Sequence, residues 1–528
     1  MPAIITDQFR ILNADTFVQS FTGIGTTTNY YYTFLAHPDP EGLQSELVNY
    51  GTSNWNTETP EPLDSFEQET SYHDSMLFLK RITGDDVRRI VTRYNWQSGS
   101  TYDMYRHDYD INTPAPSFNA KTLYEGKYVV VNSEYKVYLC IHNGSEPENP
   151  NGRKSQVEPN FVSTTPQKAS VSASDGYLWK YLFTISPADV VKFATDKYVP
   201  LPKIWGDVNT EAVKSASVNG RLESIIIDNR GANYALSEGS TLRIPVWGDG
   251  TGGEATVTIA NGEIASAEIT SPGKDYTRAH IKVSVGIQSG LNVDSSGNYI
   301  QITGGTGAQF IVPCPPKGGH GHDIYRECGS NKVMVYSKYD ADPDYVTGNS
   351  FSRIGIIKNP TVNGSKTEPL NTSTATALGA LKMYDPTSGS YPANGEISQN
   401  VGVGSTAIGY VASYNNVTGV LRYFQPTGIS EKSNSGYKVL PFSNSAAAGV
   451  STTINISGVG TSRDIDRNYT DKKITIGGKV IEFGQDFTSG IAPPDIEKYS
   501  GEIVYIDNRA PITRSASQKE ELKIVVEF

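Results

Sequence analysis

The sequence predicts a mainly β fold with minor α content (α+β), in which a β-sandwich-like core carries two inserted small β-modules. Three observations lead to this prediction. The 528 residues include 50 Gly and 29 Pro, and such a composition is typical of short strands joined by turns. Several short segments alternate apolar and polar residues, which is the period of a strand. One stretch also repeats a strand-and-turn pattern at a fixed spacing.

The strongest strand signal lies in residues 177–185. Aromatic side chains occur there at every second position, so they share one face of the strand: Tyr177, Trp179, Tyr181 and Phe183. Each aromatic side chain of this kind can bury roughly 150–250 Å2. We therefore expect the strand at the centre of a core or beneath a partner protein, and its four aromatics are candidate structural or interface residues.

Residues 499–528 are predicted to form a strand, a turn and a final strand that complete the core. Residues 501–506 are rich in β-branched and aromatic side chains and should form a strand. The next residues should turn the chain, since Asn and Asp tolerate left-handed backbone and Pro lacks an N–H: Asp507, Asn508, Arg509 and Pro511. Residues 522–528 alternate again and end on Phe528. We expect a final strand with a buried apolar face.

The other elements follow from capping residues and periodicity. Predicted helices cover residues 13–21, 65–82 and 188–195. Predicted strands cover residues 29–36 and 87–91. Predicted hairpins join 127–132 to 135–141, join 407–414 to 420–424, and lie within 473–483.

Residues 215–315 contain an internal repeat. An Asn-Gly pair, a strand and a Gly-x-x-Tyr motif occupy residues 219–234 and recur in register at 261–276. A Gly-Thr-Gly sequence at 250–252 likewise recurs at 305–307. Repetition of one strand-and-turn unit predicts a small, self-contained β-module.

The chain divides into five predicted segments. Residues 1–214 and 330–360 are two parts of one core, and residues 497–528 close that core with a hairpin and the C-terminal strand. Residues 215–329 are an inserted β-repeat module, and residues 361–496 are a second inserted β-rich module. A core split in this way requires its final strand to pair with strands far earlier in the chain.

Composition limits the expected partners and location. The formal net charge is −11 and Lys and Arg are not clustered, so we expect no nucleic-acid partner. We find no basic, apolar leader and no run of 18 apolar residues, so we expect no membrane and assembly in a cytoplasm. The 3 cysteines form no disulfide framework. The 32 tyrosines suit either protein–protein contact or ordinary use of Tyr in strands.

Three motifs invite a site but have simpler explanations. The Gly-rich residues 248–253 precede a strand, whereas a phosphate loop precedes a helix. Residues 102–109 combine aromatic and charged side chains, which favours a buried network or a subunit contact. Possible zinc ligands lie in one loop, but their spacing does not match the usual pairs: Cys314, His320, His322 and Cys328. The sequence contains no Gly-x-Ser-x-Gly elbow, and it does not place any two carboxylates at a catalytic separation. We therefore do not expect an enzyme.

Three segments carry a family resemblance. Residues 499–512 read YSGEIVYIDNRAPI and are followed by QKEE at 518–521, residues 175–183 read DGYLWKYLF, and residues 351–360 read FSRIGIIKNP. Together they resemble the gene-eight baseplate wedge proteins of T4-like contractile-tailed phages. Ser352 departs from the family pattern, which has Arg there, so the match at 351–360 is weaker.

The resemblance covers roughly half of the chain. It implies a structural virion protein of the tail baseplate, with no enzyme activity and no cofactor. It also implies a homodimer that joins other baseplate wedge proteins during tail assembly. The two β-rich modules have no counterpart in the family pattern. Two alternatives therefore stay open, a tail-associated receptor- or glycan-binding protein and a polysaccharide depolymerase.

Overall fold

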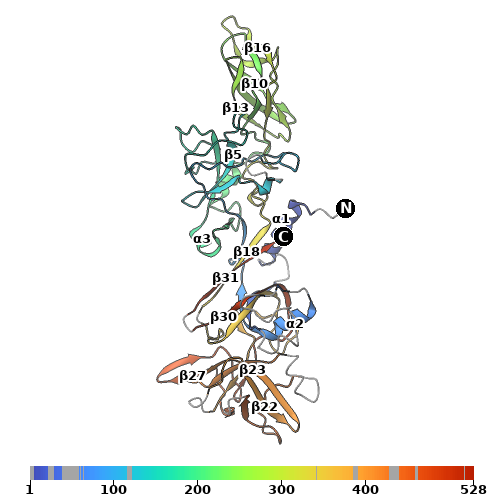
Figure 1. Cartoon of the computed structure of the whole chain (residues 1–528), viewed down its shortest axis with the longest axis vertical. Helices are drawn as coiled ribbons and strands as arrows, with labels where there is room; N and C mark the ends of the chain where they lie inside the picture. The colour runs from blue at the N-terminus through green and yellow to red at the C-terminus, as the bar shows by residue number, and fades with distance from the viewer. Residues whose placement is uncertain are drawn as a thin grey trace. The chain divides into compact units, whose positions relative to one another are not determined.

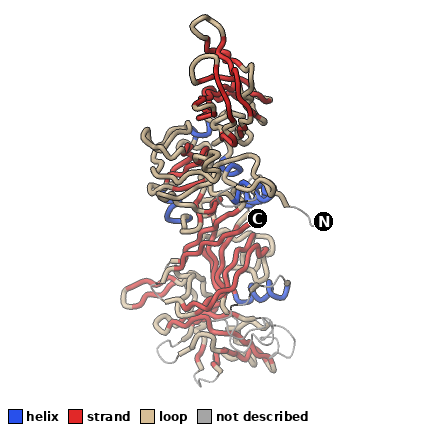
Figure 2. Tube along the Cα trace, turned by 45° about the horizontal axis from the view of Figure 1, so that its top comes forward, coloured by secondary structure: helices blue, strands red, loops and turns tan. Residues whose placement is uncertain are grey.

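The chain is mainly β with short helices, as the sequence predicts, and Figure 2 shows how strands predominate. The computed structural model describes residues 5–21, 29–38, 59, 61–62, 65–115, 120, 122–340, 342–384, 390–426, 439–457, 462–515 and 518–528. Its helices are α1 (Asp7–Ser20), α2 (Phe66–Ser75), the 3-10 helix η1 (Leu123–Glu125), α3 (Pro187–Phe193), α4 (Glu211–Ser215) and α5 (Ile324–Glu327). In this described part of the chain, none of the helices has the length and apolar character that a membrane crossing requires.

The chain forms two compact units. The first unit contains residues 1–18, 88–334 and 525–528, and the second contains residues 19–87 and 335–524. The boundaries fall inside α1 and inside three strands, β3 (Val87–Thr92), β18 (Lys332–Tyr339) and β31 (Glu520–Glu527). This division differs from the five predicted segments, because residues 1–214 contribute to both units.

The first unit holds several small antiparallel sheets, and Figure 1 labels their main strands. One has the order β4 (Val129–Val131), β5 (Lys136–Asn143), β6 (Tyr177–Thr184). Two more have the orders β10 (Thr241–Pro245), β12 (Thr251–Ala260), β13 (Glu263–Lys274) and β15 (Gln288–Val293), β16 (Tyr299–Thr306), β9 (Ala232–Leu236). Two-stranded sheets pair β17 (Gln309–Ile311) with β8 (Ile226–Asn229) and β11 (Trp247–Gly248) with β14 (Ala279–His280).

The second unit contains two larger antiparallel sheets. The five-stranded sheet has the order β20 (Thr374–Thr376), β2 (Met76–Ile82), β1 (Tyr31–Ala36), β19 (Ser350–Lys358), β30 (Glu502–Thr513). The seven-stranded sheet has the order β26 (Arg463–Asp464), β25 (Thr453–Ile456), β22 (Glu396–Gly402), β23 (Ser405–Asn415), β24 (Val420–Phe424), β21 (Gly379–Lys382), β29 (Ile491–Ala492). A separate hairpin pairs β27 (Lys473–Ile476) with β28 (Lys479–Glu482). The β-sandwich-like arrangement stays a prediction.

A further sheet contains the strands in which the unit boundaries fall. Its order is β31, β18, β3, β7 (Tyr198–Pro200). At the end of β31 in the first unit, the Phe528 N–H donates to the Asn331 carbonyl at 3.1 Å. The C-terminus is therefore hydrogen-bonded next to β18, nearly two hundred residues earlier in sequence, as expected for a long-range closure.

Most of the predicted strands and hairpins are present. β6 covers the predicted aromatic strand, and the three predicted hairpins appear as β4–β5, β23–β24 and β27–β28. α3 begins at Pro187, where the Ser186 side chain caps it by accepting from the Asp189 N–H. α1 starts at Asp7, earlier than the predicted residue 13.

The predicted helix over residues 65–82 is wrong in its second half. α2 ends at Ser75, and residues 76–82 form β2, which lies between β1 and β20. Met76, Leu77, Phe78 and Leu79 are all buried, with exposures of 2% or less. A strand covered on both faces has a continuous apolar run without alternation, and periodicity alone cannot separate that from a buried helix.

The predicted turn at residues 507–511 is also wrong, because β30 runs straight through it. Phe351 of β19 pairs with Ile512 and Arg353 pairs with Asn508, so one residue of β19 faces three residues of β30. This bulge contains Pro511 and leaves it outside the regular ladder. The missing N–H of proline is thus accommodated by a bulge within the strand.

The internal repeat is present in the backbone of the first unit. Tyr234 donates its N–H to the Gly262 carbonyl, and Tyr276 donates its N–H to the Gly220 carbonyl, so the two copies exchange equivalent hydrogen bonds. The residue before each tyrosine, Asn233 or Asp275, has a left-handed backbone with φ of 60° or 63°. The two copies are therefore paired with each other and form one unit of structure.

Each repeat tyrosine also holds a Gly-Thr-Gly turn. The Tyr276 hydroxyl accepts from the Gly253 N–H at 3.1 Å and donates to the Val246 carbonyl at 3.0 Å. The Tyr234 hydroxyl accepts from the Ala308 N–H at 3.1 Å. A Cβ on Gly250 or on Gly305 would lie within 2.4 Å of the corresponding tyrosine, so the turns require glycine there.

A buried ion pair lies at the start of β31 in the second unit. Arg514 Nε and Glu520 Oε2 are 2.8 Å apart, and their side chains are only 1% and 7% exposed. Arg514 also donates to the Val346 carbonyl and packs over the Phe78 ring. Loss of one partner leaves a buried charge without compensation.

We predict that Glu520→Ala lowers the free energy of unfolding of the second unit by about 3–5 kcal/mol. A suitable control is Lys519→Ala, because Lys519 is 59% exposed and its ion pair with Asp340 is open to solvent. That substitution should cost less than about 1 kcal/mol. Urea unfolding followed by circular dichroism measures both, and equal effects would contradict the prediction.

The second unit also buries two carboxylates close to one guanidinium. Burial raises the pKa of Asp495 to about 6 and raises the pKa of Asp344 as well, while burial lowers the pKa of Arg422 to about 10. Asp495 accepts from the Thr376 N–H, and Asp344 accepts from the Thr374 hydroxyl. The folded state thus favours a protonated Asp495 at mildly acid pH.

We predict that the second unit loses stability as the pH rises from about 4 to about 6. Because the folded pKa of Asp495 lies above its ordinary value, its contribution is complete at low pH and disappears above the folded pKa. The loss should be on the order of 2–3 kcal/mol. Asp495→Asn keeps an acceptor for the Thr376 N–H and should flatten this part of the stability–pH curve. An unchanged slope in the variant would be the contrary result.

Candidate functional site

The four candidate aromatics of β6 lie in a hydrophobic core of the first unit. The exposed fractions of Tyr177, Trp179, Tyr181 and Phe183 are 1%, 0%, 9% and 2%. Tyr177 and Trp179 stack with their ring centroids 5.1 Å apart. The Tyr177 hydroxyl donates to the Arg153 carbonyl and accepts from the Tyr102 N–H. These side chains hold the core of this chain and present almost no surface.

The candidate residues of β30 divide into a buried and an exposed group. Asn508 is 5% exposed and accepts a hydrogen bond from the hydroxyl of Tyr72. Arg509 is 63% exposed and pairs with Asp507 at 2.6 Å. Pro511 lies in the bulge and is partly buried. Only the Asp507–Arg509 pair is therefore well placed to meet another molecule.

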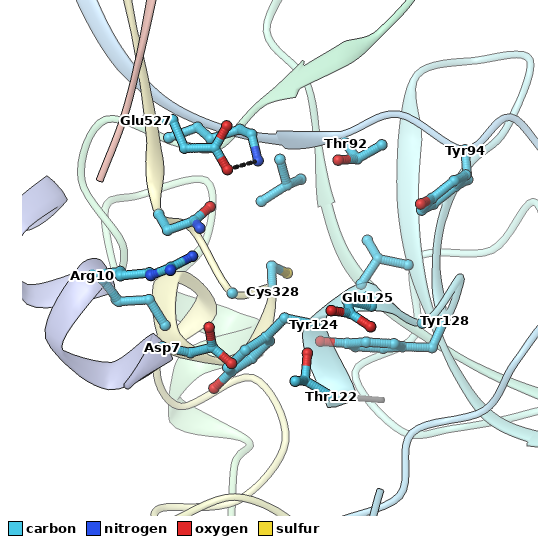
Figure 3. A pocket seen from close by; sticks show the side chains of 17 residues that line it. Asp7, Arg10, Thr92, Tyr94, Thr122, Tyr124, Glu125, Tyr128, Cys328 and Glu527 are labelled. Atoms are coloured by element: carbon cyan, nitrogen blue, oxygen red, sulfur yellow. Dashed lines mark hydrogen bonds and ion pairs between the residues drawn. The ribbon is translucent and has the colours of Figure 1, made fainter. Parts of the chain in front are cut away.

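Phe528 lies against α1 in the first unit. Its ring centroid is 5.4 Å from that of Phe17. The preceding residue, Glu527, pairs with Lys332 of β18 at 2.7 Å. This ion pair forms one wall of a polar pocket of about 230 Å3 whose other walls come from α1, β3 and η1. The pocket is the candidate site shown in Figure 3.

Charged groups and phenols surround this pocket. In Figure 3, Arg10 extends from α1 toward the cavity, and Asp7 lies beside Tyr124. Acidic and basic side chains are mixed, with Asp7, Glu125 and Glu527 against Arg10 and Lys332. The Tyr124 hydroxyl accepts from Gln8 of α1 at 3.0 Å. The pocket therefore offers hydrogen-bonding groups of both signs without a dominant charge.

The titratable phenols and the thiol of the pocket are not activated. Burial raises the pKa of Tyr94, Tyr124 and Tyr128, so these phenols stay protonated at neutral pH. Burial also raises the pKa of the Cys328 thiol, and a protonated thiol is a poor nucleophile. The pocket can bind small polar groups, but these side chains are not prepared for base or nucleophilic catalysis.

The possible zinc ligands do not converge. His320 pairs with Glu327 at 2.5 Å, and the Glu327 carboxylate also accepts from the Gly321 N–H. Cys314 is buried and directs its thiol toward the Val312 carbonyl. Among the described residues, no group of three or more His, Cys, Asp or Glu side chains could hold a metal ion. The loop around His320 is instead tied by a buried His–Glu contact.

The polar aromatic stretch 102–109 forms a largely buried network. Tyr102, Asp103, Tyr105 and Tyr109 are all at most 8% exposed. Asp103 accepts from the Lys127 N–H, and burial is the largest cause of the raised pKa values of the three tyrosines. The buried-network interpretation therefore describes this stretch.

A second pocket, in the second unit, was not predicted from the sequence. It has a volume of about 360 Å3, and its polar lining includes His73, Asp74, Lys498 and Tyr499. Asp74 accepts from the Tyr499 hydroxyl at 2.6 Å and pairs with Lys498 at 2.7 Å. Burial lowers the pKa of His73 to about 4, so its imidazole is neutral.

The strained backbone at this second pocket is a property of the folded chain that no sequence motif indicates. Tyr499 has a left-handed backbone with φ of 62°, which is a strained conformation for a bulky residue. Its contact with Asp74 spans 425 positions of sequence. Residues so far apart in sequence do not form a recognisable motif, so the pocket can be identified only from the folded chain.

No family model matches the chain. No curated protein matches it either. Any functional assignment therefore depends on the residues themselves.

We predict that removing residues 522–528 abolishes soluble folded protein. The truncation removes most of β31, including Ile524, which is 6% exposed, and the Glu527–Lys332 pair. Removal of Phe528 alone is the matched control, because β31 ends at Glu527, so the strand stays whole while the contact with Phe17 and one backbone hydrogen bond are lost. Soluble yield and circular dichroism compare the two. A folded, stable protein after the longer truncation would disprove the closing role of β31.

Proposed function

We propose that the protein is a structural subunit of a contractile-tail baseplate, a wedge protein that joins neighbouring wedge proteins during tail assembly. The observation that carries this proposal is where the resembling segments lie. Residues 351–358 and 502–512 belong to β19 and β30, which are adjacent strands of one sheet. Residues 177–183 belong to β6, in the core of the first unit.

Several residues of these segments have framework roles. Asn508 binds the hydroxyl of Tyr72, and Glu520 binds Arg514. Arg353 is fully buried and donates to the hydroxyls of Ser71 and Ser75, each at 2.9 Å. A resemblance that falls on such residues concerns how the chain is held together. A structural subunit requires such a framework.

In this proposal the protein acts without a cofactor and without catalysis. It forms a homodimer and contacts other wedge proteins through large permanent interfaces, which typically exceed roughly 2,000 Å2. Its location is the baseplate of the virion tail, after assembly in the host cytoplasm. The Asp507–Arg509 pair on β30 contributes little energy by itself, since exposed pairs give less than about 1 kcal/mol.

We predict that the purified protein is a dimer and forms larger complexes with other wedge proteins. Light scattering coupled to size-exclusion chromatography gives the mass of the protein alone and in mixtures. Complexes should persist at moderate salt, because permanent interfaces are largely apolar at their centres. A monomer that joins none of the wedge proteins would refute the proposal. Turnover of a host polysaccharide by the protein alone would favour the depolymerase alternative.

A further inference from the structure

The N-terminal helix α1 exposes apolar side chains. Phe9 and Leu12 are 53% and 56% exposed, and Ile5, just before the helix, is 57% exposed. These three residues have the spacing i, i+4, i+7, so they follow one stripe along the helix direction. Ile11 and Ala14, on the opposite side, are 4% and 0% exposed. The helix thus has two apolar sides, and one of them is uncovered.

Polar contacts hold α1 on the rest of the first unit. The Gln8 side chain donates to the Tyr124 hydroxyl and accepts from Arg326 Nη2 at 2.6 Å. Asp15 forms an ion pair with Arg89. A surface helix normally directs its apolar residues inward and its polar residues outward. In α1, Gln8 and Asp15 make anchoring contacts while Phe9 and Leu12 stay in solvent.

A groove of about 790 Å3 runs beside this exposed stripe. Phe9 and Leu12 form part of its lining, and Trp205, Tyr325 and Arg89 form another part. The Arg89 guanidinium lies 3.7 Å from the centre of the Tyr325 ring. Tryptophan, tyrosine and arginine are the residues most enriched at the energetic centres of protein interfaces. The lining therefore has the composition of a protein-binding surface.

The groove also carries cations without acidic partners. Lys214 bonds the Trp205 carbonyl at 3.1 Å, and Arg326 bonds the neutral Gln8 side chain. Within the residues that the structure describes, neither cation forms an ion pair, although the chain has a formal net charge of −11. Asp323, the nearby carboxylate, accepts from the backbone N–H groups of Tyr325 and Arg326. The lining thus holds three cations, Arg89, Lys214 and Arg326, against two carboxylates, Asp15 and Asp323, a small excess of positive charge on an acidic protein.

We infer that α1 and this groove form a docking surface for an acidic, apolar polypeptide segment of a partner protein. Leu- or Phe-type side chains of that segment cover Phe9 and Leu12, and its carboxylates pair with Lys214 and Arg326. The excess of positive charge favours an acidic occupant over a segment rich in Lys or Arg. The docking surface itself does not depend on the proposed function. The inference rests on that function only for the identity of the partner, which we expect to be another tail protein.

Two synthetic peptides test the inference on the full-length protein. Both are helix-forming peptides of about 18 residues with Leu at i, i+3, i+4 and i+7. One has Glu at the exposed positions and the other has Lys. Fluorescence anisotropy of the labelled peptides should show that the Glu peptide binds at least about tenfold more tightly than the Lys peptide. The preference should weaken at high salt.

Three double variants locate the binding. Phe9→Ser with Leu12→Ser should weaken binding of the Glu peptide about tenfold or more, and Lys214→Glu with Arg326→Glu should reverse the preference between the peptides. Val171→Ser with Val285→Ser is the matched control, because these valines are 105% and 62% exposed and do not line the groove. Circular dichroism confirms that each variant is folded.

The inference is overturned by absent binding of the Glu peptide, by equal binding of both peptides, or by equal losses in the groove and control variants. Self-association that disappears in the Phe9→Ser, Leu12→Ser variant would identify a second copy as the occupant and refute the proposed partner. Peptide binding needs no tail protein. If the peptide binds as expected but no wedge proteins assemble, the proposed function fails and the docking surface stands.

Discussion

The fold depends on hydrogen bonds from buried tyrosine hydroxyls to the backbone of distant segments. Tyr128 donates to the Glu327 carbonyl, Tyr177 to the Arg153 carbonyl and Tyr32 to the Thr372 carbonyl. A buried phenol without a partner is costly, so each ring fixes the loop that supplies its acceptor. Much of this chain is irregular between short strands, and sheet ladders alone cannot hold such loops. Internal packing therefore accounts for part of the tyrosine-rich composition.

The sequence was informative wherever the stabilising pattern is local. Alternation over residues 177–185 predicts β6, and the Gly-x-x-Tyr repeat predicts a paired module whose two tyrosines have equivalent contacts. The secondary structure predicted from the sequence was wrong where burial of both faces, or pairing with a distant segment, determines the structure. The apolar run at 76–79 is a strand because β1 and β20 cover both of its edges. Pro511 is accommodated in a bulge because β19 continues beside it.

The candidate site residues show the same limit. Periodicity places Tyr177 and Trp179 on one face, but it cannot say whether that face meets the chain's own core or another protein. The structure places it in the core. Asn508 reads as a turn residue, yet its role is set by Tyr72, which is 436 positions away. The polar pocket at the C-terminus and the pocket near Tyr499 are likewise assembled from distant segments, so no spacing in the sequence indicates them.

The five-stranded sheet has an edge strand that must be kept from pairing with other chains. β30 is an edge strand, and a long open edge invites pairing with another chain. Here Pro511, the bulge and the exposed Asp507–Arg509 pair interrupt that edge, which disfavours strand addition over this part. The apolar stripe of α1 has no such interruption, and the net charge of −11 gives only a general repulsion between acidic surfaces. The cations beside the stripe, Lys214 and Arg326, make it more favourable for an acidic segment than for a basic one.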